Sequence, residues 1–108
     1  MQIELSDRVA VVTGASSGMG AETARVMGRA GAAVLAVGRD RDRLARTVAD
    51  IEAAGGRARA LVADLADGAS AGRIVDAALE LGGRIDALVL AAGHFVHTPL
   101  AETPVEQL

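Results

Sequence analysis

The chain of 108 residues contains no cysteine, tyrosine, tryptophan or lysine, and all 11 of its basic residues are arginine. The absence of cysteine excludes disulfide bonds and thiolate chemistry. The absence of tyrosine and lysine excludes any mechanism that needs a phenol or an amine side chain from this chain alone. With one aromatic residue and a net charge of −3, the sequence also lacks the basic stripe and stacking aromatics of nucleic-acid-binding proteins.

Two further absences concern membranes. No run of about 18 apolar residues could span a bilayer, and the N-terminus does not show the pattern of a signal peptide. We therefore expect a cytoplasmic protein without a membrane partner. Hydrophobic residues make up 51% of the chain and its net charge is small, which favours a folded domain over a disordered segment.

The sequence alternates between short apolar runs rich in β-branched residues and longer segments of helix-forming residues. The apolar runs are typical of strands. The longer segments end at glycines, as helices commonly do. In one of them Leu44, Val48 and Ile51 recur at helical spacing and predict a single apolar face. The expected strands are 8–13, 33–37, 58–63 and 85–91, and the expected helices are 18–30, 42–54 and 69–81.

This alternation predicts an α/β fold, a Rossmann-type doubly wound parallel sheet with strand order 3-2-1-4. Nearly continuous apolar strands require helices on both faces of the sheet. We assign residues 1–93 to this unit and 94–108 to a loop and the start of a helix. The fourth strand has an open edge and the third helix a wide apolar arc, so we expect an incomplete sheet. Its partner would be a second copy in a homo-oligomer or a missing C-terminal half that covers the fourth strand.

A glycine-rich turn, Thr-Gly-Ala-Ser-Ser-Gly-Met-Gly at 13–20, joins the first strand to the first helix. Gly14 lets the chain turn off the strand, Gly18 leaves no Cβ between backbone and phosphate, and Gly20 lets the helix pack closely. The helix N-terminus adds free N–H groups and a positive dipole end. The turn therefore predicts a pyrophosphate-binding site, although a turn needed only for packing is the alternative. A Walker-type loop is excluded because it needs a lysine.

The Gly-x-x-x-Gly-x-Gly spacing resembles the cofactor fingerprint of the short-chain dehydrogenase/reductase family. Residues 8–40 resemble the first β-α-β unit of that family, 63–65 the end of its third strand, and 85–93 its fourth strand. The resemblance covers nearly the whole chain. It implies an oxidoreductase that transfers hydride between a nicotinamide cofactor and an alcohol or carbonyl substrate. It also implies that Ser16, Ser17 and Met19 join the three glycines in binding the cofactor.

The end of the second strand bears on the choice of cofactor. Gly38 occupies the position where NAD-preferring relatives carry an aspartate that bonds the ribose 2′-hydroxyl. Arg39 follows, and a guanidinium can bind a 2′-phosphate through two hydrogen bonds without losing its charge. We therefore favour NADP(H) over NAD(H). The alternative is that Arg39 is one surface charge in a run of alternating arginine and aspartate, in which Asp40 and Asp42 weaken the argument.

The ends of the third and fourth strands complete the expected cofactor site. The resemblance implies that Asp64 bonds the adenine amino group and that Leu65 packs near the adenine. An Asp64 that only caps a turn is the alternative. The resemblance also implies that the backbone of 91–93, which is Ala91, Ala92 and Gly93, passes close to the nicotinamide ribose.

The sequence departs from the family where the fourth strand ends. The family usually carries Asn-Asn-Ala-Gly there, whereas this chain has Leu90-Ala91-Ala92-Gly93 and so lacks both amide side chains. We expect Leu90 to be buried instead. This departure bears on the detailed geometry of the cleft and not on the fold.

No catalytic residue is assigned to this chain. The serine, tyrosine, lysine and asparagine that carry out catalysis in the family all fall beyond residue 108, so we expect no turnover by this chain alone. The leading interpretation is the cofactor-binding N-terminal portion of an enzyme. The alternatives are a non-catalytic nucleotide-binding module and an assembly piece that needs a partner chain.

Two histidines, His94 and His97, follow the fourth strand. Either could act as an acid or base near neutral pH, but we expect exposed loop side chains. A metal site is not expected, because no third ligand accompanies the pair.

Overall fold

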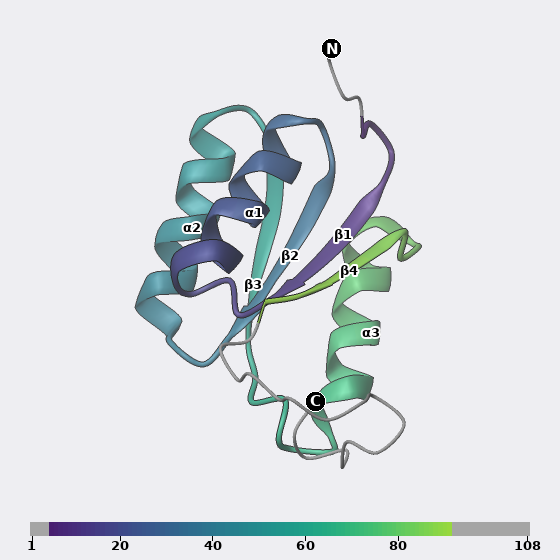
Figure 1. Cartoon of the computed structure of the whole chain (residues 1–108). Coiled ribbons are helices and arrows are strands. Elements are labelled where there is room, and N and C mark those ends of the chain that lie inside the picture. The colour runs from purple at the N-terminus through teal and green to yellow at the C-terminus, as the bar shows by residue number, and fades with distance from the viewer. Residues whose placement is uncertain (1–4, 92–108) are drawn as a thin grey trace, which may run out of the picture.

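The computed structural model describes residues 5–91, which form a parallel sheet of four strands flanked by three helices (Figure 1). Each expected strand and helix is present, with ends that differ from the expected ones by at most two residues. Together they confirm the predicted α/β architecture. In chain order they are β1 (Val9–Thr13), α1 (Gly18–Arg29), β2 (Ala33–Gly38), α2 (Arg41–Ala53), β3 (Arg57–Val62), α3 (Ser70–Gly82) and β4 (Ala87–Leu90).

The strand order is β3-β2-β1-β4, and every pairing is parallel, as predicted. Helices α1 and α2 lie on one face of the sheet and α3 lies on the other (Figure 1). The register pairs Thr13 with Val37 and with Leu90, and pairs Gly38 with Val62. The carboxyl ends of all four strands therefore lie along one edge of the sheet.

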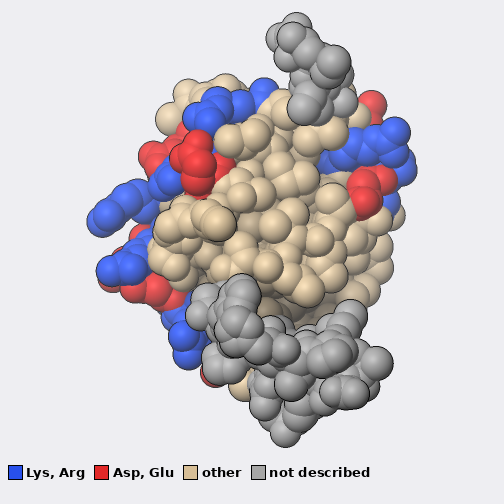
Figure 2. Space-filling view, viewed as in Figure 1, with Lys and Arg blue, Asp and Glu red and all other residues tan. Residues whose placement is uncertain are grey.

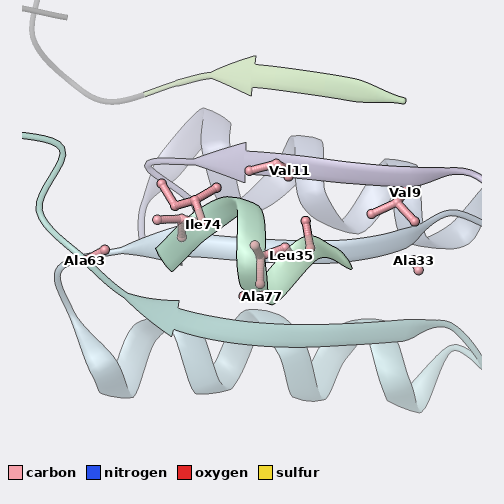
Figure 3. Close-up of a cluster of buried hydrophobic side chains, with 9 residues drawn as sticks. Val9, Val11, Ala33, Leu35, Ala63, Ile74 and Ala77 are labelled. Carbon is pink, nitrogen blue, oxygen red and sulfur yellow. The ribbon is translucent and has the colours of Figure 1, made fainter. Parts of the chain in front are cut away.

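Two apolar clusters hold the layers together. Beneath α3, residues such as Val11 and Leu35 of the sheet pack against Ile74 (Figure 3). On the other face, Leu44 and Ile51 of α2 are 0% and 1% exposed, so the apolar face predicted for this helix is confirmed. Because apolar burial is the main favourable term in folding, these clusters fix the sheet that carries the strand ends.

The outer face of β4 is open in the described part of the chain. Leu88 and Leu90 are 59% and 62% exposed, and on α3 Val75 and Leu79 are 44% and 48% exposed. The expectation that Leu90 would be buried is wrong for residues 5–91. The physical reason is that β4 is the last strand of the described sheet and alternates its side chains, so Ala87 and Val89 pack inward on the α1 side.

Among residues 5–91, no helix is long and apolar enough to cross a membrane.

Candidate cofactor site

The sheet register brings the predicted site residues to one edge. The glycine turn follows β1, Arg39 follows β2, Asp64 lies two residues beyond β3, and Ala91 follows β4. Backbone hydrogen bonds continue past the strand ends: the Ala63 N–H donates to the Gly38 carbonyl at 2.9 Å, and the Ala91 N–H donates to the Thr13 carbonyl at 3.3 Å. Ligands of open parallel sheets bind outside the carboxyl ends of the strands, so this edge is the candidate site.

Each glycine of the turn has its own structural reason. Gly14 and Gly18 have φ of +68° and +48°, a backbone conformation that favours glycine. Gly20 has no such torsion, but a Cβ there would lie 2.0 Å from the Gly14 carbonyl oxygen. The turn is therefore shaped by two backbone torsions and one close approach, and α1 begins directly against the loop.

The N-terminus of α1 is open. Ser17 is the N-cap residue but its side chain makes no capping hydrogen bond, and the first turn of the helix contains no acidic residue. The first N–H groups of a helix have no partner within the helix, and they carry the positive end of its dipole. By contrast, α2 is capped by Asp40, which accepts from the Arg43 N–H at 3.1 Å. Of these two helix starts, α1 is the one suited to an external anion.

A residue that the sequence analysis did not single out holds the turn in place. The Thr47 hydroxyl of α2 donates to the Ala15 carbonyl at 3.0 Å, and the threonine is 1% exposed. On the other side, the Ala15 N–H donates to the Val37 carbonyl at 3.0 Å. The turn is thus anchored to both α2 and β2. The available signal was a hydroxyl residue on the apolar face of α2, between Leu44 and Ile51.

Arg39 and Asp40, the two charged residues that follow β2, differ in whether their side chains have a partner. Arg39 is exposed and has no ion-pair or hydrogen-bond partner among residues 5–91. Asp40 is occupied: besides capping α2, its carboxylate lies 3.5 Å from Nε of Arg43. The nearest acidic neighbour in sequence therefore does not neutralise Arg39.

Asp64 takes part in a turn. Its Oδ1 accepts from the Ala66 N–H at 2.9 Å, and its backbone carbonyl accepts from the Ser70 hydroxyl at 2.6 Å. The turn-capping alternative is therefore realised in the structure. The other carboxylate oxygen has no partner among residues 5–91, so it is free to accept a hydrogen bond. Leu65 is half-buried and packs against the cluster beneath α3.

Two of the remaining expected site residues lie in the described part of the chain, and the others lie outside it. Met19 is 77% exposed beside the turn, and Ala91 is half-buried at the end of β4. Ala92, Gly93, His94 and His97 lie outside the described residues. Within residues 5–91, no group of three or more acidic or histidine side chains could hold a metal ion.

A clearly shifted pKa occurs at the opposite edge of the sheet. The pKa of Asp86 is lowered, first because its carboxylate accepts from the Val9 N–H at 2.8 Å. This outweighs the desolvation that opposes it, and Arg84 and Arg8 lower the pKa further. Asp86 therefore ties the approach to β4 onto the start of β1 and has no part in the cofactor site.

Comparison with known proteins places this geometry in a family. The model of the short chain dehydrogenase family matches residues 8–108. The chain belongs to the short-chain dehydrogenase family. It is similar to the A-factor type gamma-butyrolactone 1′-reductase (1S-forming) of Streptomyces virginiae, with 45% identity over 83 residues.

Two solved structures of short-chain dehydrogenases resemble the chain at 36% identity each. One is a metagenomic short-chain oxidoreductase in complex with NADP, with a TM-score of 0.78. The other is a short chain dehydrogenase/reductase from Burkholderia phymatum in complex with NAD, with a TM-score of 0.75. The matches cover 95% and 80% of this chain. The two neighbours carry different cofactors, so the likeness by itself does not select one.

The chain is shorter than these short-chain dehydrogenases. It spans 32% of the Streptomyces reductase and 49% and 31% of the two structures. The match therefore covers only part of each of these proteins.

Proposed function

We propose that this chain forms the NADP(H)-binding, N-terminal portion of a short-chain dehydrogenase/reductase. The observation that carries the proposal is Arg39, an exposed guanidinium without a partner among residues 5–91, directly after the side-chain-free Gly38. An NAD-selecting site would place a carboxylate here to accept from the 2′-hydroxyl. Here the acidic residue nearest in sequence, Asp40, uses its carboxylate to cap α2, which leaves the cation of Arg39, unpartnered among residues 5–91, to meet a 2′-phosphate.

The other residues of the edge fit the rest of a dinucleotide. The open N-terminus of α1 suits the pyrophosphate. The hydroxyls of Ser16 and Ser17 have no partner among residues 5–91 and are free to bond the ribose or the phosphates. Asp64 offers one unpartnered oxygen to the adenine amino group, with Leu65 beside it. The bound cofactor would supply hydride exchange with the substrate carbon, while these residues bind and orient it.

We also propose that residues 1–108 contain no catalytic residue. The chain has no tyrosine and no lysine, so neither a phenol nor an amine is present to move the substrate proton. The expected result is no loss of NADPH absorbance when the 108-residue chain is mixed with a panel of ketones and aldehydes. Carbonyl-dependent oxidation of NADPH by that chain, purified to homogeneity, would overturn this part of the proposal.

The exposed side of β4 and α3 is a candidate surface for contact with another segment. In the view of Figure 2 the surface between the flanking charged groups is uncharged over a wide area, and β4 runs across this side in Figure 1. Among residues 5–91, Leu88 and Leu90 of β4 and Leu79 of α3 are exposed large apolar side chains. Such a patch together with an unpaired strand edge is typical of a surface that another segment covers. We propose that the remaining part of a longer polypeptide covers it, as opposed to a second copy of this chain.

The cofactor assignment is tested by calorimetric titration of NADP⁺ and NAD⁺ into the full chain and its Arg39→Ala variant. Wild type should bind NADP⁺ more tightly. The variant should lose about tenfold or more in NADP⁺ affinity, because hydrogen bonds to charged groups contribute about 1.5–3 kcal/mol. Its NAD⁺ affinity should stay within about twofold of wild type, a change of a few tenths of a kcal/mol.

The matched control is Arg46→Ala, which removes the same charge from an exposed position further along α2. It should leave both affinities unchanged. Tighter binding of NAD⁺ by wild type, or equal loss of both cofactors in Arg39→Ala, would contradict the assignment.

A further inference from the structure

Gly38 has no backbone torsion that requires glycine. It is absent from the residues with positive φ, and it pairs with Val62 in the regular ladder between β2 and β3. Its lack of a side chain therefore has another cause. A Cβ at this position would lie 2.9 Å from Oγ of Ser16 and 3.2 Å from its Cβ.

A second side chain also crowds the added atom. The same Cβ would lie 3.3 Å from Cδ2 of Leu44, which is 0% exposed and belongs to the cluster beneath α1 and α2. The carbonyl of Gly38 accepts from the Ala63 N–H at 2.9 Å, so the strand end is also held. Protein interiors are closely packed, so moving these neighbours to admit a Cβ lowers stability.

Ser16 cannot retreat as a unit either. The residue before it, Ala15, is held at its carbonyl by Thr47 and at its N–H by Val37. What remains free is rotation of the Ser16 side chain. A side chain at position 38 would therefore turn the Ser16 hydroxyl away from the direction in which it is now free to meet a ligand.

We propose that Gly38 and Ser16 act as one cofactor-selecting pair, in which the bare α-carbon of Gly38 keeps the Ser16 hydroxyl in its binding position. This inference rests on the proposed cofactor site and deepens it. Its consequence is that an acidic residue cannot simply be introduced at position 38 to accept a ribose 2′-hydroxyl. It displaces Ser16 first, so a change to NAD(H) selectivity requires a change at both positions.

The test is a double-mutant cycle on the full chain with Gly38→Ala and Ser16→Gly. Gly38→Ala adds only the Cβ and no charge, so it isolates the steric effect. In the wild-type background it should weaken NADP⁺ and NAD⁺ binding by about tenfold and lower the thermal midpoint, since overpacking a tight site is costly. In the Ser16→Gly background the same substitution should change affinity by less than about twofold, because no Ser16 side chain is left to displace.

Gly72→Ala is the matched control, because a Cβ there meets nothing within 4 Å. It should leave cofactor affinity unchanged in both backgrounds. Equal losses for Gly38→Ala with and without Ser16 would overturn the inference, since the obstruction would then come from Leu44 alone.

A second comparison tests selectivity directly. Gly38→Asp alone should bind both cofactors weakly, whereas Ser16→Gly with Gly38→Asp should bind NAD⁺ more tightly than NADP⁺. A single Gly38→Asp chain that binds NAD⁺ tightly at an unchanged thermal midpoint would refute the coupling.

Failure of the underlying function gives a different pattern. If wild type binds neither cofactor, or prefers NAD⁺, the proposed function is wrong. The thermal midpoints of the four chains in the cycle still decide whether residues 16 and 38 are coupled.

Discussion

Replacing Gly20 by alanine tests whether the approach of α1 to the glycine turn shapes the candidate site. An added Cβ would lie 2.0 Å from the carbonyl oxygen of Gly14 and 2.6 Å from its carbonyl carbon. Relaxed carbon–oxygen contacts are about 3.3–3.6 Å, so α1 and the turn must separate by roughly 1 Å or more. The two Gly14 atoms that the Cβ would meet belong to the backbone, so no rotamer change can relieve the clash.

The magnitude follows from two opposed terms. Alanine in place of glycine within a helix stabilises by up to about 1 kcal/mol, and less in the first turn, where Gly20 lies. Overpacking costs about 1–3 kcal/mol, and a backbone clash belongs at the upper end of that range. We therefore expect the free energy of unfolding to fall by about 2 kcal/mol and cofactor affinity to fall at least about tenfold, because the N–H groups of α1 move away from the phosphates.

The assay is urea unfolding of the full chain combined with calorimetric titration of NADP⁺. Substitutions at two other glycines separate the steric clash from the effects of helix propensity and backbone strain. Gly72→Ala, in an exposed part of α3 with nothing within 4 Å, should gain stability up to about 1 kcal/mol. Gly18→Ala also meets open space but has φ of +48°, so it should lose about 1–2 kcal/mol from backbone strain alone.

One result would refute this reasoning. If Gly20→Ala unfolds within about 0.5 kcal/mol of wild type, the range of an unremarkable surface substitution, and binds NADP⁺ unchanged, then α1 does not press on the turn. The close approach would then have no role in shaping the site.

Three further outcomes are expected. Thr47→Val should lower the free energy of unfolding by about 1–3 kcal/mol, because the buried Ala15 carbonyl loses its donor. The control is Thr23→Val, since the Thr23 hydroxyl donates only to the Met19 carbonyl of its own helix, and it should change that free energy by less than about 0.5 kcal/mol. Equal losses for the two variants in urea unfolding would contradict the anchoring role of Thr47. The pKa of Asp86 is lowered in the folded state, so its stabilisation is present above the unfolded pKa and is lost as pH falls through the folded value. The thermal midpoint of Asp86→Asn should therefore fall less than that of wild type between about pH 5 and about pH 2, whereas Asp76→Asn, an exposed carboxylate of α3, should follow wild type; parallel curves for Asp86→Asn and wild type would exclude this linkage. In the longer polypeptide, where we propose that a further segment covers β4, Leu88→Ala should cost about 2–5 kcal/mol of stability. A cost below about 0.5 kcal/mol, typical of a side chain in solvent, would contradict that cover; Val26→Ala on the exposed side of α1 is the control.

Local pattern was enough to predict the elements of the fold. Helix α2 shows why: Leu44 and Ile51 lie on the predicted apolar face, and glycines follow directly where the helix ends. Periodicity and glycine conformation act within a few residues, so they can be read along the chain. Leu90 was predicted wrongly because its exposure depends on whether another segment covers β4, which no local pattern encodes.

The candidate site was predictable in its positions but not in its contacts. The glycine turn was predicted from its glycine spacing between a strand and a helix, and Arg39 from its place after the end of the second strand. Thr47 was missed because its partner, Ala15, is 32 residues away in sequence. Likewise, the sequence alone did not indicate that the carboxylate of Asp40 caps the start of α2.

By itself, then, the sequence determined the order of strands and helices, the torsions that Gly14 and Gly18 make possible, and the family. Only the tertiary structure decided that Gly38 abuts Ser16, and that the residue against which Gly20 packs closely is Gly14. The physical reason is that these contacts depend on how closely α1 and β2 pack against the turn. That distance is set by the side chains of both layers together, and no single segment carries it.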